Sequence, residues 1–303
     1  MVQHNITMKS MKFEKIHIIV NLKSGHDEPI LSYLEEAFQE SGIDWAVSII
    51  KNENDAKAFA LQWIGKVDVI AVYGGDGSVA QVAQELIGSD TALAIIPGGT
   101  ANVISKELGI PQDTREAIKQ LKSFYMEYIQ MDMGSANDCL FIIRINLGIM
   151  ADMVIDATRK LKNQVGQLAY GIAAIQSIAK TDPVKYKMKI DGVDILEEGV
   201  ALTITNCGNI GIGDYSFLPD ISIVDGFLDV ILLKQADLMS VLRIAGTTFM
   251  KTESDVWMHW TCKEIEIILE TTQKMIVDDC EQETNYLHIK IIPSALKVLV
   301  PLK

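Results

Sequence analysis

The segment DVIAVYGGDGS, residues 68–78, joins an apolar run to a glycine-rich turn. Residues 68–73 have the length and apolar content of a buried strand, and apolar residues recur at helical spacing from Val79 to Ile87. Glycines between a strand and a helix let the backbone approach a phosphate, whose charge the helix N-terminus attracts. The turn therefore predicts a phosphate-binding site, with an ordinary glycine-rich turn as the alternative.

The same alternation of strand and helix extends over residues 12–130. Strands are expected at 16–20, 45–50, 68–73 and 92–96. Helices are expected at 30–38, 56–64, 79–87, 101–108 and 115–121, with Asp55 and Thr114 as caps and with Gly42, Gly65 and Gly109 beyond helix ends. Such alternation predicts an α/β domain, a parallel sheet with helices on both faces.

Short β-rich runs replace this alternation after about residue 130. They occupy 140–145, 186–190, 200–205, 228–233, 265–269, 287–292 and 296–300. Turn signals separate several of them, at Asp191-Gly192, Asp225-Gly226 and Pro293-Ser294. The pattern predicts a second domain, 131–303, built as an antiparallel β-sandwich and interrupted by helices around 155–179 and 238–250.

Composition and net charge limit the classes of protein to which the chain can belong. The formal net charge of −13 argues against nucleic acid as a general partner, because binding to a phosphate backbone needs a basic surface. The four cysteines are too far apart to indicate a zinc site or a disulfide framework. No secretory signal and no run of about 18 apolar residues is present, so a cytoplasmic protein without a membrane span is expected.

Two further loops follow predicted strands. Residues 97–102, PGGTAN, come after the fourth strand, and residues 21–25, NLKSG, come after the first. Carboxyl ends of neighbouring strands are where open α/β sheets bind ligands, so the loops are predicted to share one site. A tight turn with Thr100 as a helix cap is the alternative for 97–102. Asp76 would repel a phosphate unless Mg²⁺ or an ordered water lies between them.

These loops, in this order, resemble the motifs of the diacylglycerol kinase catalytic-domain family. That family includes bacterial diacylglycerol kinase-like lipid kinases and eukaryotic sphingosine and ceramide kinases. Asp279-Cys280-Glu281 and the terminal stretch 291–298 resemble its late motif and its C-terminal strand pair. The resemblance covers residues 12–303 and implies an NAD kinase-like first domain, since NAD kinases share the GGDG sequence.

The resemblance also implies cofactors and residue roles. ATP and Mg²⁺ would be the cofactors, with the nucleotide bound by Asn21, Ser24, Gly25, Gly74, Gly75, Asp76, Gly77, Ser78, Thr100 and Asn102. Asp279 would remove the proton from a lipid hydroxyl, with Glu281 and Asp76 as further catalytic residues. If residues 278 and 279 lie on a strand, Asp278 points away from the site.

A structural Mg²⁺ is implied in the loop that precedes the strand at 228–233. Its ligands would be the Asp225 carboxylate and the main-chain carbonyl groups of Ser222 and Phe227. Hard cations take such sets of oxygen atoms. A plain Asp-Gly turn is the alternative.

Three positions depart from the family's pattern. Val103 stands where an aspartate is frequent, Cys280 where a glycine is usual, and Ile50 where a threonine is usual, unless Ser48 substitutes for it. These departures leave open a catalytically silent lipid- or nucleotide-binding protein. An NAD kinase-like enzyme is a further alternative to an ATP-dependent kinase of a diacylglycerol-like lipid.

The expected partner is a membrane lipid, reached by peripheral contact with the membrane surface. Arg159–Lys162 could meet lipid head groups and the apolar stretch 165–175 could meet acyl chains, with a helix packed on the sandwich as the alternative. A homodimer is left open. The sequence does not decide which lipid alcohol is the acceptor.

Overall fold

The structure is a computed structural model of the chain and describes residues 13–24, 28–122, 126–148, 182–211, 216–234 and 257–302. It divides into two compact units. One runs up to Met131 and includes the chain again from Leu296, and the other runs from Asp132 to Ala295. The sequence placed the division at residue 130 and all later residues in the second domain, whereas the residues from Leu296 belong to the first unit.

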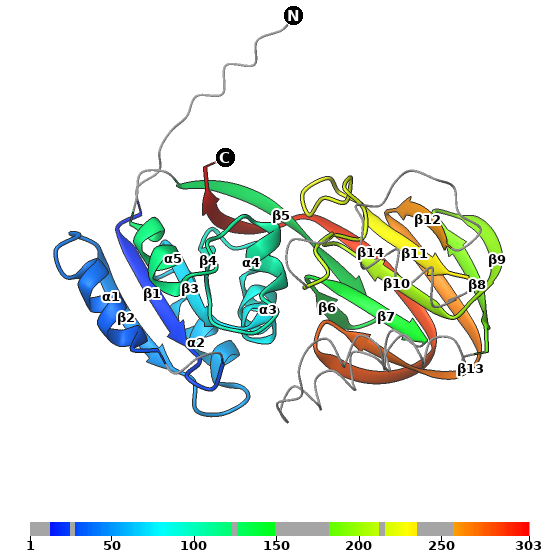
Figure 1. Cartoon of the computed structure of the whole chain (residues 1–303), viewed down its shortest axis with the longest axis horizontal. Coiled ribbons are helices and arrows are strands. Elements are labelled where there is room, and N and C mark those ends of the chain that lie inside the picture. The colour runs from blue at the N-terminus through cyan, green and yellow to red at the C-terminus, as the bar shows by residue number, and fades with distance from the viewer. Residues whose placement is uncertain are drawn as a thin grey trace, which may run out of the picture. The chain divides into compact units, whose positions relative to one another are not determined.

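The first unit is built on a parallel sheet (Figure 1). Its strands are β1 (Lys15–Val20), β2 (Asp44–Ile49), β3 (Val69–Gly74) and β4 (Ala92–Pro97), in the order β2-β1-β3-β4. Every residue of β3 and β4 is buried, as expected for strands with helices on both faces. The end of β14 (Cys280–Pro301) continues this sheet beside β4, with Val298 opposite Leu93. The predicted α/β fold of this unit is confirmed.

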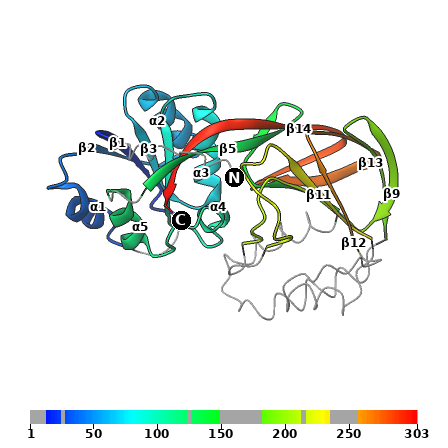
Figure 2. The same ribbon diagram turned by 90° about the horizontal axis from the view of Figure 1, so that it is seen from above.

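Five helices cover the sheet, at the five places where the sequence predicts them. They are α1 (Ile30–Phe38), α2 (Asp55–Trp63), α3 (Asp76–Leu86), α4 (Val103–Glu107) and α5 (Thr114–Leu121). α2 packs on α3 and α1 packs on α5, and Figure 2 shows these pairs on opposite faces of the sheet. The expected cap at Thr114 is wrong, because Asp113 precedes α5 and its carboxylate accepts the Glu116 N–H at 2.9 Å.

The strand order creates a topological switch point. The chain leaves β1 for β2 on one side and then crosses to β3 on the other side of β1. The loops that follow β1 and β3 therefore run in opposite directions from adjacent strand ends, which opens a crevice. The Asn21 N–H donates to the Tyr73 carbonyl oxygen at 2.9 Å, which confirms that these two strand ends are neighbours.

The second unit is antiparallel and confirms the predicted β-rich region. Its strands are the last part of β5 (Met126–Ala136), β6 (Cys139–Phe141), β7 (Arg144–Gly148), β8 (Val184–Ile190), β9 (Val193–Gly199), β10 (Ala201–Thr205), β11 (Leu228–Leu233), β12 (Trp257–Cys262), β13 (Glu264–Val277) and the first part of β14. They follow the order β12-β11-β10-β7-β13-β14, with β8 paired to β13 and to β9. One face buries an apolar core that includes Leu202, Val230, Ile267 and Leu287.

Several details of this unit differ from the sequence prediction. β5, β9 and β12 were not expected, and the turn predicted at Pro293-Ser294 is wrong, because β14 continues through it with Ser294 in a left-handed conformation (φ 51°). The helices expected around 155–179 and 238–250 lie outside the described residues. No helix within the described ranges is both long and apolar enough to cross a membrane.

Candidate nucleotide site

Three loops meet at the switch point of the first unit. The Asn21 side chain donates to the Ser78 hydroxyl at 2.8 Å, which joins the first loop to the second. The Gly98 N–H donates to the Gly74 carbonyl oxygen at 2.9 Å, which joins the third loop to the second. The structure thus brings the three sequence motifs together in one place. Ser24 lies in the first loop, and the predicted Gly25 lies outside the described residues.

The second and third loops touch through two glycines. A Cβ atom at Gly99 would lie 2.5 Å from the Gly75 Cα, whereas a Cβ atom at Gly75 would lie 3.4 Å from the Gly99 Cα. Gly75 has φ −86° and ψ 178°, a conformation open to any residue. Glycine is therefore needed at position 99, because the two main chains approach each other closely there, and the backbone conformation at Gly75 does not require a glycine.

The third loop is closed by Asn102, which precedes α4. Its backbone is left-handed (φ 49°), and its side-chain oxygen accepts the Gly99 N–H at 2.8 Å. Asn102 thus takes the position before the helix that was considered for Thr100, and Thr100 is exposed. Val103, the departure from the family pattern, is the buried first residue of α4.

Asp76 joins the second loop to the same helix. It is the first residue of α3, and one carboxylate oxygen accepts the Ile104 N–H at 3.1 Å. A carboxylate at this position is stabilised by the positive end of the α3 dipole. The sequence predicts that Asp76 binds a metal or takes part in catalysis. The structure shows that it also holds the start of α4 through its bond with the Ile104 N–H.

The N-terminus of α3 points into this loop cluster without a side-chain cap. The helix is 11 residues long and follows directly on Gly75, which offers no capping group. Main-chain N–H groups in the first turn of a helix have no partner within the helix. Such an end attracts anions, and a phosphate can approach closely because the adjoining loop residues are glycines. The local chemistry suits a phosphate group.

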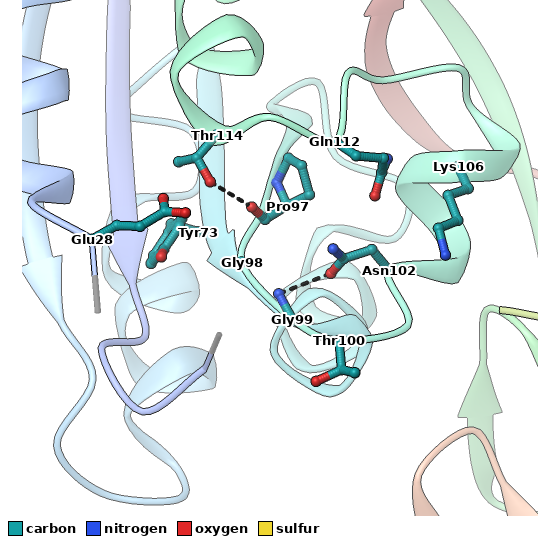
Figure 3. A pocket seen from close by; sticks show the side chains of 10 residues that line it. All are labelled: Glu28, Tyr73, Pro97, Gly98, Gly99, Thr100, Asn102, Lys106, Gln112 and Thr114. Atoms are coloured by element: carbon teal, nitrogen blue, oxygen red, sulfur yellow. Dashed lines mark hydrogen bonds between the residues drawn. The ribbon is translucent and has the colours of Figure 1, made fainter. Parts of the chain in front are cut away.

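An open pocket of about 230 Å³ adjoins the third loop (Figure 3). It is lined by Glu28, Tyr73, Pro97, Gly98, Gly99, Thr100, Asn102, Lys106, Gln112 and Thr114. Glu28 and Tyr73 lie on one side, and Lys106 and Gln112 lie on the other. One Glu28 carboxylate oxygen is buried and accepts no hydrogen bond from the residues that the structure describes. Burial, with Glu28 and Tyr33 nearby, raises the pKa of Tyr73.

At the end of β2, Ile50 and Ser48 both make contacts inside the unit. Ile50 is half-buried, and its N–H donates to the Val20 carbonyl oxygen at 2.8 Å. The Ser48 hydroxyl lies 2.9 Å from Nε2 of the buried His17. Ser48 therefore has a contact inside the unit, and its substitution for the threonine stays a prediction.

In the second unit, Asp278 and Asp279 form the two-residue turn between β13 and β14. Val277 pairs with Cys280, and Asp278 is left-handed (φ 51°). The assumption that the two aspartates lie on a strand is therefore wrong. Asp279, like the predicted Glu281, is exposed, and Glu281 lies 3.9 Å from the ammonium group of Lys274.

Asp278 has an internal role instead. Its carboxylate accepts the N–H groups of Ile142, Ile143 and Arg144 at 2.9, 2.9 and 3.0 Å. Burial raises the pKa of this carboxyl to about 6, although the three amide donors act in the opposite direction. These bonds also explain why the strand predicted at 140–145 is divided into β6 and β7. Asp278 thus anchors the turn that presents Asp279.

The loop predicted to hold a structural cation precedes β11. The Asp225 carboxylate accepts the Phe227 N–H at 3.0 Å, and the Ser222 hydroxyl accepts the Val224 N–H at 3.4 Å. Burial raises the pKa of Asp225, and Asp229 and Asp132 add to the shift. Within the described ranges, no group of three or more His, Cys, Asp or Glu residues could hold a metal. The predicted set contains only one side chain of these types, together with two main-chain carbonyl groups. The cation site at Asp225 therefore stays a prediction.

Sequence reasoning missed a buried carboxylate beside this loop. Asp132 is 2% exposed, and its two oxygens accept the N–H groups of Gly226 and Ser294, each at 2.7 Å. It therefore connects β5, the loop before β11 and the bend in β14. A single aspartate between two methionines gives no sequence signal for this role. Arg159–Lys162 and residues 165–175, predicted for the membrane, lie outside the described residues.

Comparison with known proteins agrees with this geometry. Residues 15–136 match the model of the diacylglycerol kinase catalytic domain, and residues 144–300 match the YegS C-terminal NAD kinase beta sandwich-like domain. The chain belongs to the diacylglycerol kinase catalytic-domain family. This family membership makes the chain a lipid kinase of the diacylglycerol kinase type.

Individual relatives span most of the chain. A diacylglycerol kinase of Bacillus subtilis is 28% identical over 239 residues, covering 77% of this chain and 78% of that protein. An uncharacterized protein of Synechocystis is 28% identical over 240 residues, which are 77% of this chain and 55% of that longer protein. A solved diacylglycerol kinase structure from Bacillus anthracis has a TM-score of 0.78 at 25% identity, covering 96% of this chain and 98% of that one.

Proposed function

We propose that the chain transfers the γ-phosphoryl group of ATP to the hydroxyl group of a diacylglycerol-like membrane lipid. The observation that best supports this proposal is the cluster of three loops at the switch point, which hydrogen bonds join to one another beside the uncapped N-terminus of α3. Open α/β sheets bind nucleotides at such points, and helix N-termini bind phosphates. Membership of a lipid kinase family supports a lipid acceptor.

The nucleotide would use both the loops and the pocket. Its phosphates would lie against Gly74–Ser78, because the close contact of Gly75 with Gly99 keeps side chains out of that space. Its nucleoside would extend into the pocket, where the Glu28 carboxylate can accept a hydrogen bond from a ribose hydroxyl or an amino group. Mg²⁺ bound with the phosphates would neutralise charge on the transferred group.

Asp279 is the proposed general base. A lipid alcohol is a weak nucleophile, and a positioned carboxylate that removes its proton contributes about 10²–10⁴-fold to the rate. Asp279 is exposed at the tip of a turn that Asp278 holds through three backbone bonds. The rigid anchor and the accessible neighbouring carboxylate suit this role. Glu281 lies two residues further on and would assist it.

A structural Mg²⁺ at Asp225 is part of the proposal. The Asp225 carboxylate is partly buried, and the nearby Asp229 and Asp132 also disfavour its negative charge. A divalent cation held by this carboxylate and by the carbonyls of Ser222 and Phe227 would relieve that repulsion. The cation would fix the loop before β11. We further propose a cytoplasmic protein that contacts the membrane surface only peripherally.

The test is transfer of label from γ-labelled ATP to lipids presented in mixed micelles. Diacylglycerol, sphingosine and ceramide are assayed in parallel with NAD as a soluble acceptor. Asp279→Asn should lower transfer to the lipid at least about 100-fold, whereas the exposed matched control Asp194→Asn should not. Labelling of NAD without detergent would establish the NAD kinase-like alternative and refute a lipid acceptor.

A silent, nucleotide-binding relative is the second candidate. Asp76 already bonds the α4 backbone, and Val103 is buried where the family often carries a carboxylate. ATP binding measured by calorimetry, with no label transferred to any acceptor, would favour this candidate. Turnover with any of the three lipids rules it out.

A further inference from the structure

A buried arginine lies beside the turn that presents Asp279. Arg144 is the first residue of β7, and 9% of its surface is exposed. Its N–H donates to the Asp278 carboxylate at 3.0 Å, and its carbonyl oxygen accepts the Asp278 N–H at 2.9 Å. Arg144 is therefore bound twice to the residue that anchors the proposed catalytic turn.

The guanidinium group of Arg144 contacts both sides of the loop that follows β10. One of its Nη atoms donates to the Asn209 carbonyl oxygen, and its central carbon lies 5.1 Å from the centre of the Phe217 ring. The two sides of the loop are joined as well, since the Phe217 N–H donates to the Gly208 carbonyl oxygen at 3.0 Å and Asn209 forms a β-bridge with Ser216. These four residues form the loop base. Arg144 thus holds one side of the loop base by a hydrogen bond and the other by a cation–π contact.

The loop begins level with Asp279 in the sheet. Asp278 bonds Arg144, so Asp279 is level with Ile143, the residue before Arg144. The Asn206 N–H donates to the Ile143 carbonyl oxygen at 2.9 Å where the chain leaves β10. β13, β7 and β10 are successive strands of one sheet (Figure 1), and neighbouring strands lie about 4.8 Å apart, so the loop starts roughly 10 Å from the catalytic turn. The loop therefore borders the place where a lipid would meet Asp279.

Stability does not explain a charged side chain at this buried position. Removing a guanidinium group from water is costly, and apolar side chains of similar volume often give equal or greater stability at buried charged positions. Arginine adds geometry instead, because its planar fork of donors can bond a carbonyl group and stack on a ring at the same time. Arg144 uses both features on the loop base.

We propose, on the basis of the proposed lipid kinase function, that Arg144 is a positioning residue for the lipid acceptor. It holds the loop base against the turn of Asp278 and Asp279, so that the lipid hydroxyl group and the general base keep a fixed separation. A displacement of about 1 Å between reacting groups costs about 10²-fold in rate. Loss of the guanidinium group should therefore impair the use of the lipid, while the affinity for ATP, which is assigned to loops of the first unit, stays the same.

The test measures kcat and KM for diacylglycerol in mixed micelles, and the Kd for ATP by calorimetry, in two variants of Arg144. Arg144→Met removes the donors and the charge, and it should lower kcat/KM for the lipid at least about tenfold with the ATP Kd unchanged. Arg144→Lys keeps the charge and one donor group but loses the planar fork, so it should recover part of the loss. A lysine variant no better than the methionine variant would overturn the proposal.

Thr203→Val is the matched control for stability. Thr203 is 3% exposed, and its hydroxyl donates to the Asn146 side chain at 2.9 Å. It lies two positions from Thr205, which pairs with Arg144, so it occupies the same face of the sheet. Thr203→Val should lower Tm and leave kcat/KM for the lipid unchanged. If kcat/KM falls in proportion to Tm in both Thr203→Val and Arg144→Met, the role of Arg144 is structural only.

A double-mutant cycle tests the contact between Arg144 and the loop base. Phe217→Leu keeps an apolar side chain but removes the ring face. The double variant should lose little more lipid kcat/KM than Arg144→Met alone, whereas fully additive losses would refute a shared positioning role. An active wild type with a fully active Arg144→Met variant would overturn this proposal alone. A wild type that phosphorylates no lipid would overturn the proposed function and this proposal with it.

Discussion

Gly99→Ala should damage the nucleotide site more than Gly75→Ala, although the two glycines touch each other. An added Cβ at Gly99 would lie 2.5 Å from the Gly75 Cα, and one at Gly75 would lie 3.4 Å from the Gly99 Cα. The first distance is about 0.9 Å too short for an ordinary contact. The two loops must therefore separate by about 1 Å in Gly99→Ala, and they need not separate in Gly75→Ala.

The cost can be worked out from what connects the loops. Separation stretches the bond from the Gly98 N–H to the Gly74 carbonyl oxygen, now 2.9 Å, and the bond from the Gly99 N–H to Asn102, now 2.8 Å. Overpacking of this kind costs about 1–3 kcal/mol of stability. If the same strain opposes binding, 1–3 kcal/mol corresponds to a loss of affinity of about 5- to 150-fold. We expect a loss of ATP affinity in this range for Gly99→Ala and of less than about threefold for Gly75→Ala.

Calorimetric titration with ATP measures both variants, and thermal unfolding confirms that they are folded. Gly88→Ala is a control for stability alone, because Gly88 is left-handed (φ 68°) with open space around it, away from the loops. It should lower Tm without changing ATP affinity. If Gly99→Ala binds ATP like the wild type, or if Gly75→Ala is the worse variant, the close contact of the two loops does not shape the site.

Four further variants test three single carboxylates and one histidine. Asp279→Asn should lower kcat at least about 100-fold without changing Tm. Asp278→Asn removes one of the two carboxylate oxygens that accept three N–H groups, so it should lower Tm clearly. Asp132→Ala leaves two N–H groups without their acceptor, so the free energy of unfolding in urea should fall by about 2–6 kcal/mol. Burial lowers the pKa of His17 to about 4. The unfolded chain then takes up the proton first, and about 3 kcal/mol of stability should be lost between pH 6.5 and 4, a loss absent from His17→Gln.

The architecture of the first unit was predictable because local patterns determine it. Buried strands such as Val69–Gly74 are continuous apolar runs, and the helices between them repeat apolar residues every three or four positions. A parallel sheet brings the carboxyl ends of its strands to one edge, so the meeting of the three loops follows from topology alone. The bonds between Asn21 and Ser78 and between Gly98 and Gly74 are the result.

The contacts of single carboxylates were not predictable, because they depend on distant residues. Asp278 bonds residues more than 130 positions away, and Asp132 bonds Gly226 and Ser294, which are 94 and 162 positions away. Neither aspartate belongs to a periodic pattern. Strand β9 was missed for a different reason, since its sequence VDILEEG is acidic and resembles a solvated loop.

Asp76 shows why an acidic residue occupies a turn that is otherwise suited to anions. The negative charge of Asp76 repels a phosphate. One of its carboxylate oxygens, however, accepts the Ile104 N–H near the N-terminus of α4, and Asp76 is itself the first residue of α3. Two helix ends therefore stabilise it, and in return it fixes the third loop against the second. The same geometry leaves a negative charge beside the proposed phosphate position, where a divalent cation would be held between them. The positioning contact and the proposed metal contact are therefore compatible, because a carboxylate can serve both at once.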